Sequence, residues 1–167
     1  MKTYVVGGWV RDGLLNKVND QIEFDIVTDK NGIMLAKHVA QKLKVKKVSI
    51  YKTFGTAAFI YKNIILEFNG ARKESYLKES RDPIVSNGTI LEDQKRRDFT
   101  INAMSISLNK KNYGELIDPF EGLSDLKNKI ITTPLDPDKT YSDDPLRMMR
   151  AIRFSSVLGF EIDESSI

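Results

Sequence analysis

Two acidic side chains alternate along a strand-like segment near the N-terminus and could bind a metal ion. In residues 22–27, Ile-Glu-Phe-Asp-Ile-Val, the two-residue period of a strand places Glu23 and Asp25 on one face and the apolar residues on the other. Such carboxylates repel each other unless solvent or a cation relieves the charge. Mg²⁺ prefers hard oxygen ligands and needs neither histidine nor cysteine. Taken alone, the pattern is more typical of a solvated face, so both interpretations stay open.

A third carboxylate, Glu67, interrupts the apolar run at residues 64–68. It could join Glu23 and Asp25 if the two strands are neighbours in a sheet. The three acids would then form one metal-binding cluster.

A glycine pair, Gly7-Gly8, separates the first strand-like run from a helical pattern. Backbone without a Cβ can approach a phosphate closely, and Arg11, one helical turn on, could reach the same anion. A glycine pair at this place is more often only a turn. Its closeness in sequence to Glu23 and Asp25 favours a shared site.

Two further segments are rich in arginine. Lys95-Arg96-Arg97-Asp98 is followed by Thr100 and Asn102, and a solvated loop with local ion pairs is the simpler explanation. Arg147, Arg150 and Arg153 are spaced by three along a late helix, and we expect them opposite a buried stripe of Leu146, Met149, Ile152 and Val157. Either Asp143 and Asp144 or a bound phosphate could balance these cations.

The elements that must position these residues alternate between strand and helix patterns. The sequence predicts a strand at 2–6, a helix from Val10 and strands at 22–27, 46–49, 56–61, 64–68, 103–108 and 115–117, with helices at 31–43, 123–131 and from 146. Lys62-Asn63 predicts a hairpin turn, and residues 134–137 a linker. Arg81-Asp82-Pro83 and Asn87-Gly88 are turn residues, so we expect a long, mobile loop over 72–88.

Composition narrows the possible functions. The 167 residues include 26 Lys+Arg and 23 Asp+Glu, for a net charge of +3, which is too small an excess to indicate nucleic-acid binding. The absence of cysteine excludes disulfides, thiolate zinc sites and a cysteine nucleophile. The sequence contains no apolar run of ~20 residues and no signal-peptide pattern, so we expect a soluble cytoplasmic protein without a membrane partner.

Together these segments resemble the class II CCA-adding enzymes and the bacterial poly(A) polymerases of the DNA polymerase β-like nucleotidyltransferase superfamily. The resemblance spans nearly the whole chain. It is carried by Val6-Gly7-Gly8-Trp9-Val10-Arg11-Asp12, Glu23-Phe24-Asp25-Ile26-Val27-Thr28, Phe54-Gly55-Thr56, Glu67, Arg72, Leu91-Glu92-Asp93-Gln94-Lys95-Arg96-Arg97-Asp98-Phe99-Thr100-Ile101-Asn102-Ala103-Met104, Ile117-Asp118-Pro119-Phe120, Gly122-Leu123-Ser124-Asp125-Leu126 and Asp144-Pro145-Leu146-Arg147-Met148-Met149-Arg150-Ala151-Ile152-Arg153-Phe154.

The resemblance implies an α+β fold: a mixed five-stranded sheet flanked by helices in a head domain over residues 1–137, then the start of a helical neck over 138–167. It implies Glu23 and Asp25 as catalytic Mg²⁺ ligands, with Glu67 a third catalytic acid. It also implies that the nucleotide is bound by Gly7, Gly8, Arg11, Arg97, Asp98, Asn102, Arg150 and Arg153.

The activity implied is template-independent addition of CCA to the 3′ end of tRNA, with CTP and ATP as substrates and pyrophosphate released. A poly(A) polymerase, or an enzyme that adds only CC or only A, would share this head domain. A nucleotide- or RNA-binding fragment with impaired catalysis is a further alternative. The resemblance sets no oligomeric state.

The sequence departs from the family pattern at two positions and in one motif. Glu23 stands where the first metal ligand is normally aspartate, although Asp20 could take that role if residues 21 and 22 bulge. Asn16 replaces a common glycine. The base-reading Glu-Asp-x-x-Arg motif of the neck would lie beyond Ile167, so we expect residues 1–167 to bind nucleotides without selecting between them or adding CCA efficiently.

Overall fold

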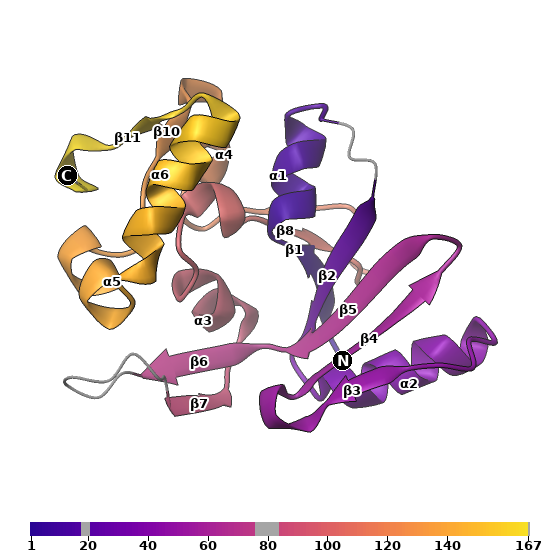
Figure 1. The fold of residues 1–167 in the computed structure, drawn as a ribbon. Helices are drawn as coiled ribbons and strands as arrows, with labels where there is room; N and C mark the ends of the chain where they lie inside the picture. The colour runs from indigo at the N-terminus through magenta and orange to yellow at the C-terminus, as the bar shows by residue number, and fades with distance from the viewer. Residues whose placement is uncertain (18–20, 76–83, 167) are drawn as a thin grey trace.

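The computed structural model describes residues 1–17, 21–75 and 84–166 (Figure 1). Within that part of the chain the main sheet has seven strands in the order β3-β4-β5-β2-β1-β8-β9. They are β1 (Thr3–Val6), β2 (Ile22–Thr28), β3 (Ser49–Tyr51), β4 (Thr56–Tyr61), β5 (Ile64–Gly70), β8 (Ser105–Ser107) and β9 (Leu116–Ile117). The β2–β5 pair is parallel, and the other neighbours are antiparallel.

The mixed sheet and its helices confirm the α+β fold class. The expected count of five strands is wrong for the described residues, because two short strands extend the sheet at its edges. The three-residue β3 pairs with β4, and the two-residue β9 pairs with β8. Two of the five strands between them carry the acidic residues: β2 carries Glu23 and Asp25, and β5 carries Glu67.

The helices are α1 (Gly8–Leu14), α2 (Gly32–Lys42), α3 (Ile90–Lys95), α4 (Gly122–Asn128), α5 (Pro137–Asp143) and α6 (Leu146–Leu158), with 3₁₀ turns η1 (Lys52–Phe54), η2 (Thr100–Asn102) and η3 (Glu164–Ser166). Helix α2 begins where the Asn31 Oδ1 accepts a hydrogen bond from the Met34 N–H, 3.0 Å away. It buries Leu35, Ala36 and Ala40 against the sheet, and its bounds agree with the helix predicted over 31–43.

Several predicted segments differ from the structure. Residues 72–88 are not one long loop, because β6 (Arg72–Ser75) and β7 (Ile84–Asn87) pair as an antiparallel hairpin. The turn residues 81–83 lie outside the described residues. The helix predicted over 123–131 ends at Asn128, and Ile130–Ile131 form β10, which pairs with β11 (Glu161–Ile162). Helix α5 begins within the predicted linker, where Asp136 caps it and Pro137 fits its first turn.

The orientation predicted for α6 is wrong. Leu146, Met149, Ile152 and Val157, the expected buried stripe, are between 50% and 66% exposed. The buried residues of α6 are Ala151 and Phe154. Polar anchoring decides this orientation, because Arg147 and Arg150 point at residues 96–98, where they donate to the Arg96 carbonyl and to Asp98.

Both faces of the central strands are covered for part of their length. Alternate residues of β1 contribute to two clusters, with Val5 in the larger one on the α2 side and Tyr4 and Val6 in a smaller one with Val27. Asp25 and Glu23 lie on the same face of β2 as the buried Val27, but Asp25 is half-buried and Glu23 is exposed. None of the helices in the described ranges is long and apolar enough to cross a membrane.

Candidate functional site

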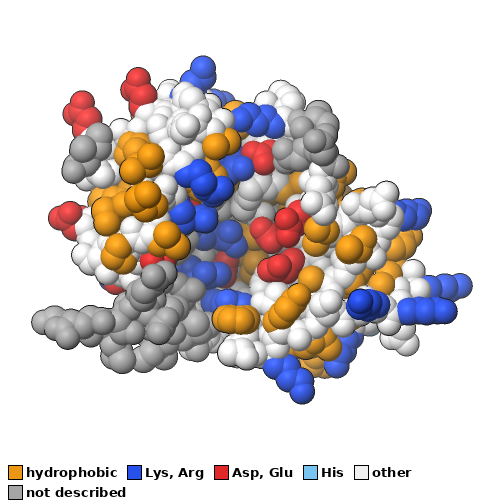
Figure 2. All heavy atoms as spheres, in the orientation of Figure 1, with side chains coloured by type: hydrophobic (Ala, Val, Ile, Leu, Met, Phe, Trp, Pro, Cys, Tyr) orange, Lys and Arg blue, Asp and Glu red, His pale blue; other side chains and the backbone are white. Residues whose placement is uncertain are grey.

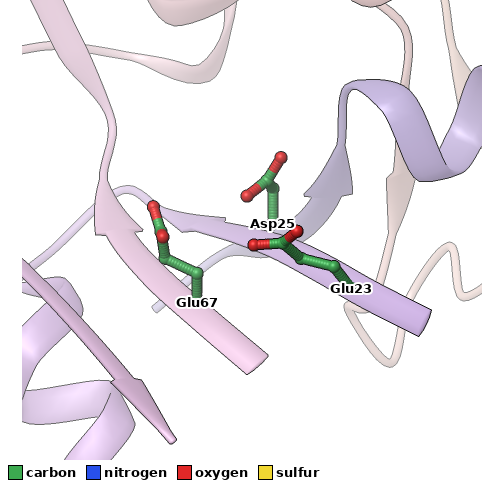
Figure 3. A group of neighbouring side chains, drawn as sticks. All are labelled: Glu23, Asp25 and Glu67. Carbon is green, nitrogen blue, oxygen red and sulfur yellow. The ribbon is translucent and has the colours of Figure 1, made fainter. Parts of the chain in front are cut away.

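Three carboxylates meet on the open face of the sheet. Parallel pairing of β2 with β5 sets Asp25 directly beside Glu67, and strand alternation places Glu23 on the same face. One oxygen from each side chain lies within 4.8 Å of the others. Figure 3 shows the three side chains rising from the two strands toward one another. The structure thus brings together the three acids that the sequence singled out.

The electrostatics of this cluster favour a bound cation. Burial raises the pKa of Asp25 to about 6, the Arg97 guanidinium opposes the shift, and the neighbouring charges of Glu67 and Glu23 add to it. A divalent ion would relieve both the repulsion and the cost of burial. The donor set consists of carboxylate oxygens, the hard ligands that Mg²⁺ takes, so the residues fit that ion.

Gly7 lies between the acidic cluster and the basic residues. Its φ of 76° is in the left-handed region, and a Cβ added there would lie 3.2 Å from the Arg97 Nη1 and 3.4 Å from the Asp25 Oδ2. The Gly7 N–H donates to the Met104 carbonyl, 3.3 Å away. The role of Gly7 is therefore to leave room for Asp25 and Arg97, while its own amide is directed into the fold.

The buried carboxylate of Asp93 holds the side chains of Arg96 and Arg97 in place. Asp93 is fully buried, and its two oxygens accept from the Arg96 Nη2 at 2.8 Å and the Arg97 Nη2 at 3.0 Å. Burial acts to raise the pKa of Asp93, but the two guanidiniums outweigh it and hold that pKa below its ordinary value. No role was predicted for Asp93, although its i,i+3 and i,i+4 spacing to Arg96 and Arg97 is a signal visible in the sequence.

Asp98 and Asn102 connect α6 to α1. The Asp98 Oδ2 accepts from the Arg150 Nε at 2.7 Å, and its Oδ1 accepts from the Asn102 Nδ2 at 3.1 Å. The Asn102 Oδ1 in turn accepts from the Arg11 Nη1 at 2.7 Å. The chain Arg150–Asp98–Asn102–Arg11 therefore links three segments that are far apart in the sequence.

Three guanidinium groups pack around the ring of Phe154. Those of Arg153, Arg11 and Arg150 lie 4.5, 5.1 and 5.5 Å from its centroid. An open cavity of about 220 Å³ beside them is lined by Arg96, Arg97, Asp98, Asp144, Arg147 and Arg150. Figure 2 shows the basic side chains gathered across a hollow from the acidic ones. Such a concentration of planar, bidentate donors is suited to phosphate groups.

For two of the predicted site residues, Gly8 and Arg153, the contacts give weaker support for a place in the site. A Cβ on Gly8 would meet only the Arg11 side chain, at 3.5 Å, so this position is not crowded by the acids. Arg153 covers Phe154 and does not line the cavity beside it. Asp20, the alternative to Glu23, lies outside the described residues.

A mixed sheet with clustered carboxylates on its open face, beside a set of arginines, is suited to a nucleotide-binding protein, since the carboxylates can take a metal ion and the arginines phosphate groups. The Poly A polymerase head domain family matches residues 3–132, and this chain belongs to that family.

Comparison with known proteins agrees with this assignment. The chain is 43% identical over 166 residues to the A-adding tRNA nucleotidyltransferase of Aquifex aeolicus (strain VF5), a match that covers 99% of the chain and 20% of the relative. A solved structure of a CCA-adding enzyme in an apo form superposes with a TM-score of 0.89 at 39% identity, covering 99% of this chain and 38% of that one. A tRNA nucleotidyltransferase complexed with a primer tRNA and an incoming ATP analog has a TM-score of 0.83 at 40% identity, covering 99% and 44%. The chain thus spans less than half the length of each.

Proposed function

We propose that this chain is the catalytic head of a template-independent nucleotidyltransferase that adds CCA to the 3′ end of tRNA, using CTP and ATP. One observation carries the proposal. The acidic cluster of Glu23, Asp25 and Glu67 lies next to Arg97, because a Cβ on Gly7 would be 3.2 Å from the Arg97 Nη1 and 3.4 Å from the Asp25 Oδ2. This is the arrangement that nucleotidyl transfer requires, because a metal-bridged triphosphate needs carboxylates on one side and cations on the other.

In the proposed reaction the primer 3′-oxygen attacks the α-phosphorus of the nucleoside triphosphate. The 3′-hydroxyl loses its proton to solvent, a new oxygen–phosphorus bond forms, the bond from the α-phosphorus to the oxygen it shares with the β-phosphorus breaks, and pyrophosphate leaves. Glu23, Asp25 and Glu67 would hold Mg²⁺, which when bound lowers the pKa of the attacking hydroxyl and offsets the charge on the phosphates. Arg11, Arg97 and Arg150 would hold the triphosphate.

Asp98 and Asn102 keep those arginines in position. Because Asp98 is held by the Phe99 N–H at 2.8 Å as well as by Asn102 and Arg150, its carboxylate has little freedom to turn. The Asn102 amide orients Arg11 in the same way. We therefore assign Asp98 and Asn102 to the nucleotide site, with Gly7, Gly8 and Arg153 at its border.

The glutamate at position 23 is compatible with metal binding. Its carboxylate lies within 4.8 Å of those of Asp25 and Glu67, so the additional methylene does not remove it from the cluster. This favours an active head domain over a nucleotide-binding fragment with impaired catalysis.

We also propose that the head domain covers residues 1–137 and that residues 138–167 begin a helical neck. The family match over residues 3–132 ends just before this boundary. Helix α6 meets the head through the side chains of Arg147 and Arg150, in addition to Ala151 and Phe154. The neck would thus complete the nucleotide site.

The choice of nucleotides is tested by incorporation. Labelled CTP and ATP, alone and together, are offered with Mg²⁺ to tRNA ending before CCA and to tRNA ending in CC. Because the chain spans 20% of the Aquifex relative, the assay is run with this chain and with any longer protein that contains it. A longer protein is expected to add C, C and A and then stop, and the activity of residues 1–167 shows how much of the chemistry this part supplies alone.

The other outcomes distinguish the alternatives. Addition of A only to the CC-ending tRNA would indicate an A-adding enzyme, which the Aquifex similarity also supports. Addition of C only would indicate a CC-adding enzyme, and a long A tract a poly(A) polymerase. No incorporation by a protein that still binds nucleotide would contradict the catalytic proposal.

A further inference from the structure

Asn69 lies beside the acidic cluster and contacts one of its members. It follows Glu67 by two residues on β5, so both side chains are on the same face of the strand. The Asn69 Nδ2 donates a hydrogen bond to the Glu67 Oε1, 3.0 Å away. The bond occupies one carboxylate oxygen and leaves the other available to a ligand.

The orientation of the Asn69 amide is set by its other contacts. Its Oδ1 accepts from the Thr56 Oγ1 at 2.5 Å and from the Arg72 Nη2 at 3.3 Å. A guanidinium can only donate, so a flipped amide would turn its NH₂ group toward Arg72 and its oxygen toward the Glu67 carboxylate. Only the observed orientation satisfies all three neighbours.

The two residues that hold Asn69 are themselves fixed to the fold. Thr56 is the direct partner of Asn69 in the antiparallel pairing of β4 with β5. The Arg72 side chain donates to the Phe54 carbonyl as well as to Thr56, and its backbone N–H donates to the buried Asp93 carboxylate at 3.2 Å. Asn69 thus sits in a frame built from β4, β5 and β6.

We propose that Asn69 is a positioning residue of the metal site: it holds the Glu67 carboxylate so that the free oxygen stays turned toward Asp25 and Glu23. The inference rests on the proposed function, because it assigns Glu67 to metal binding. Ligating carboxylates are commonly held by such a second hydrogen bond, and its loss typically lowers metal affinity ~10- to 100-fold.

The test uses Mn²⁺ alone as the probe, with free ion measured by electron paramagnetic resonance during titration of the whole chain. Asn69→Leu keeps the size of the side chain and removes the amide, and we expect it to weaken Mn²⁺ binding about 10-fold. Asn128→Leu makes the same substitution on the exposed surface of α4 and should bind like wild type. Thr56→Val removes the hydroxyl that holds Asn69 and should weaken binding by a smaller factor.

A double mutant separates positioning from a general structural effect. If Asn69 acts through Glu67, the double variant Asn69→Leu/Glu67→Gln binds Mn²⁺ no more weakly than Glu67→Gln alone. In the nucleotide-addition assay, Asn69→Leu should lower kcat and leave the KM for nucleotide unchanged. Near-ultraviolet circular dichroism shows whether Asn69→Leu folds. If it does not, Thr56→Val replaces it: this variant is compared with wild type, and the double variant Thr56→Val/Glu67→Gln with Glu67→Gln.

Two results would overturn the proposal. Wild-type Mn²⁺ affinity in Asn69→Leu, alongside weakened binding in Glu67→Gln, would show that the hydrogen bond does not position the ligand. Additive losses in the double variant would show that Asn69 acts independently of Glu67. Failure of the proposed function looks different, because Asp25→Ala and Glu67→Gln would then bind Mn²⁺ as well as wild type.

Discussion

Arg150 of α6 donates from its Nε to the Asp98 Oδ2 at 2.7 Å, across 52 positions of the chain. Asp98 is 9% exposed, and its other oxygen is held by Phe99 and Asn102. This pair orients the last long helix so that its arginines face the head. The cavity beside Arg96 and Arg97 exists because α6 is held in that orientation.

Removing Arg150 should weaken nucleotide binding. In Arg150→Ala we expect the Kd for ATP to rise about 10-fold, because one charge-assisted phosphate contact contributes ~1.5–3 kcal/mol and part of it is screened at this half-exposed side chain. Fluorescence titration with a labelled ATP analog measures the change. Met149→Ala, on the exposed side of the same helix, is the control. An equal loss in both variants would contradict the assignment.

Neutralising Asp25 should stabilise the metal-free protein at neutral pH while abolishing incorporation. Since burial raises the pKa of Asp25 from 3.8 to about 6, the folded state holds this proton more tightly than the unfolded state does. The ionised carboxylate therefore costs stability above pH 6, and the cost disappears as the pH falls toward 4. We expect Asp25→Asn to be more stable than wild type by ~1–2 kcal/mol at pH 8 and nearly equal to it at pH 4.

Chemical unfolding with a chelator present, at the two pH values, checks this. Added Mg²⁺ should shrink the difference at pH 8, since only the wild-type site gains binding energy from the ion. A destabilised Asp25→Asn at pH 8 would make Asp25 a structural residue and count against the metal site.

The two glycines of the first turn should respond differently to alanine. At Gly7 the φ of 76° costs an L-residue ~1 kcal/mol or more, and the new Cβ would press on Arg97 and Asp25. We expect Gly7→Ala to reduce incorporation at least 10-fold. Gly8→Ala has open space except for the flexible Arg11 and should retain most activity. The test measures the rate of single-nucleotide incorporation by each variant. Equal rates would show that the space beside Arg97 and Asp25 does not matter for activity.

The unexpected orientation of α6 can be tested through stability. Phe154 is 8% exposed and packs edge-on against Phe99, so Phe154→Ala should lower the free energy of unfolding by ~3 kcal/mol or more. Ile152 is 58% exposed, and Ile152→Ala should change it by less than ~0.5 kcal/mol. Urea unfolding of the 167-residue chain distinguishes them. A large loss in Ile152→Ala would restore the buried stripe expected from the sequence.

Local patterns in the sequence were sufficient for much of the fold and part of the site. The two-residue period of β2 places Glu23 and Asp25 on one face, and the turn at Lys62-Asn63 joins β4 to β5 as expected. The series of motifs predicted the family, which the match over residues 3–132 confirms. These features depend on residues close together in the chain, so the sequence determines them directly.

Tertiary structure decided which distant residues meet. No local pattern states that β2 pairs in parallel with β5, or that the register sets Glu67 beside Asp25 and Asn69 next to both Thr56 and Glu67. The period of α6 was read correctly from the sequence, but which face turns inward was decided by the acceptors that the head offers to Arg147 and Arg150. Each of these guanidiniums takes an acceptor that only the folded chain supplies, so the face of α6 that carries them turns inward and Leu146, Met149 and Ile152 stay exposed.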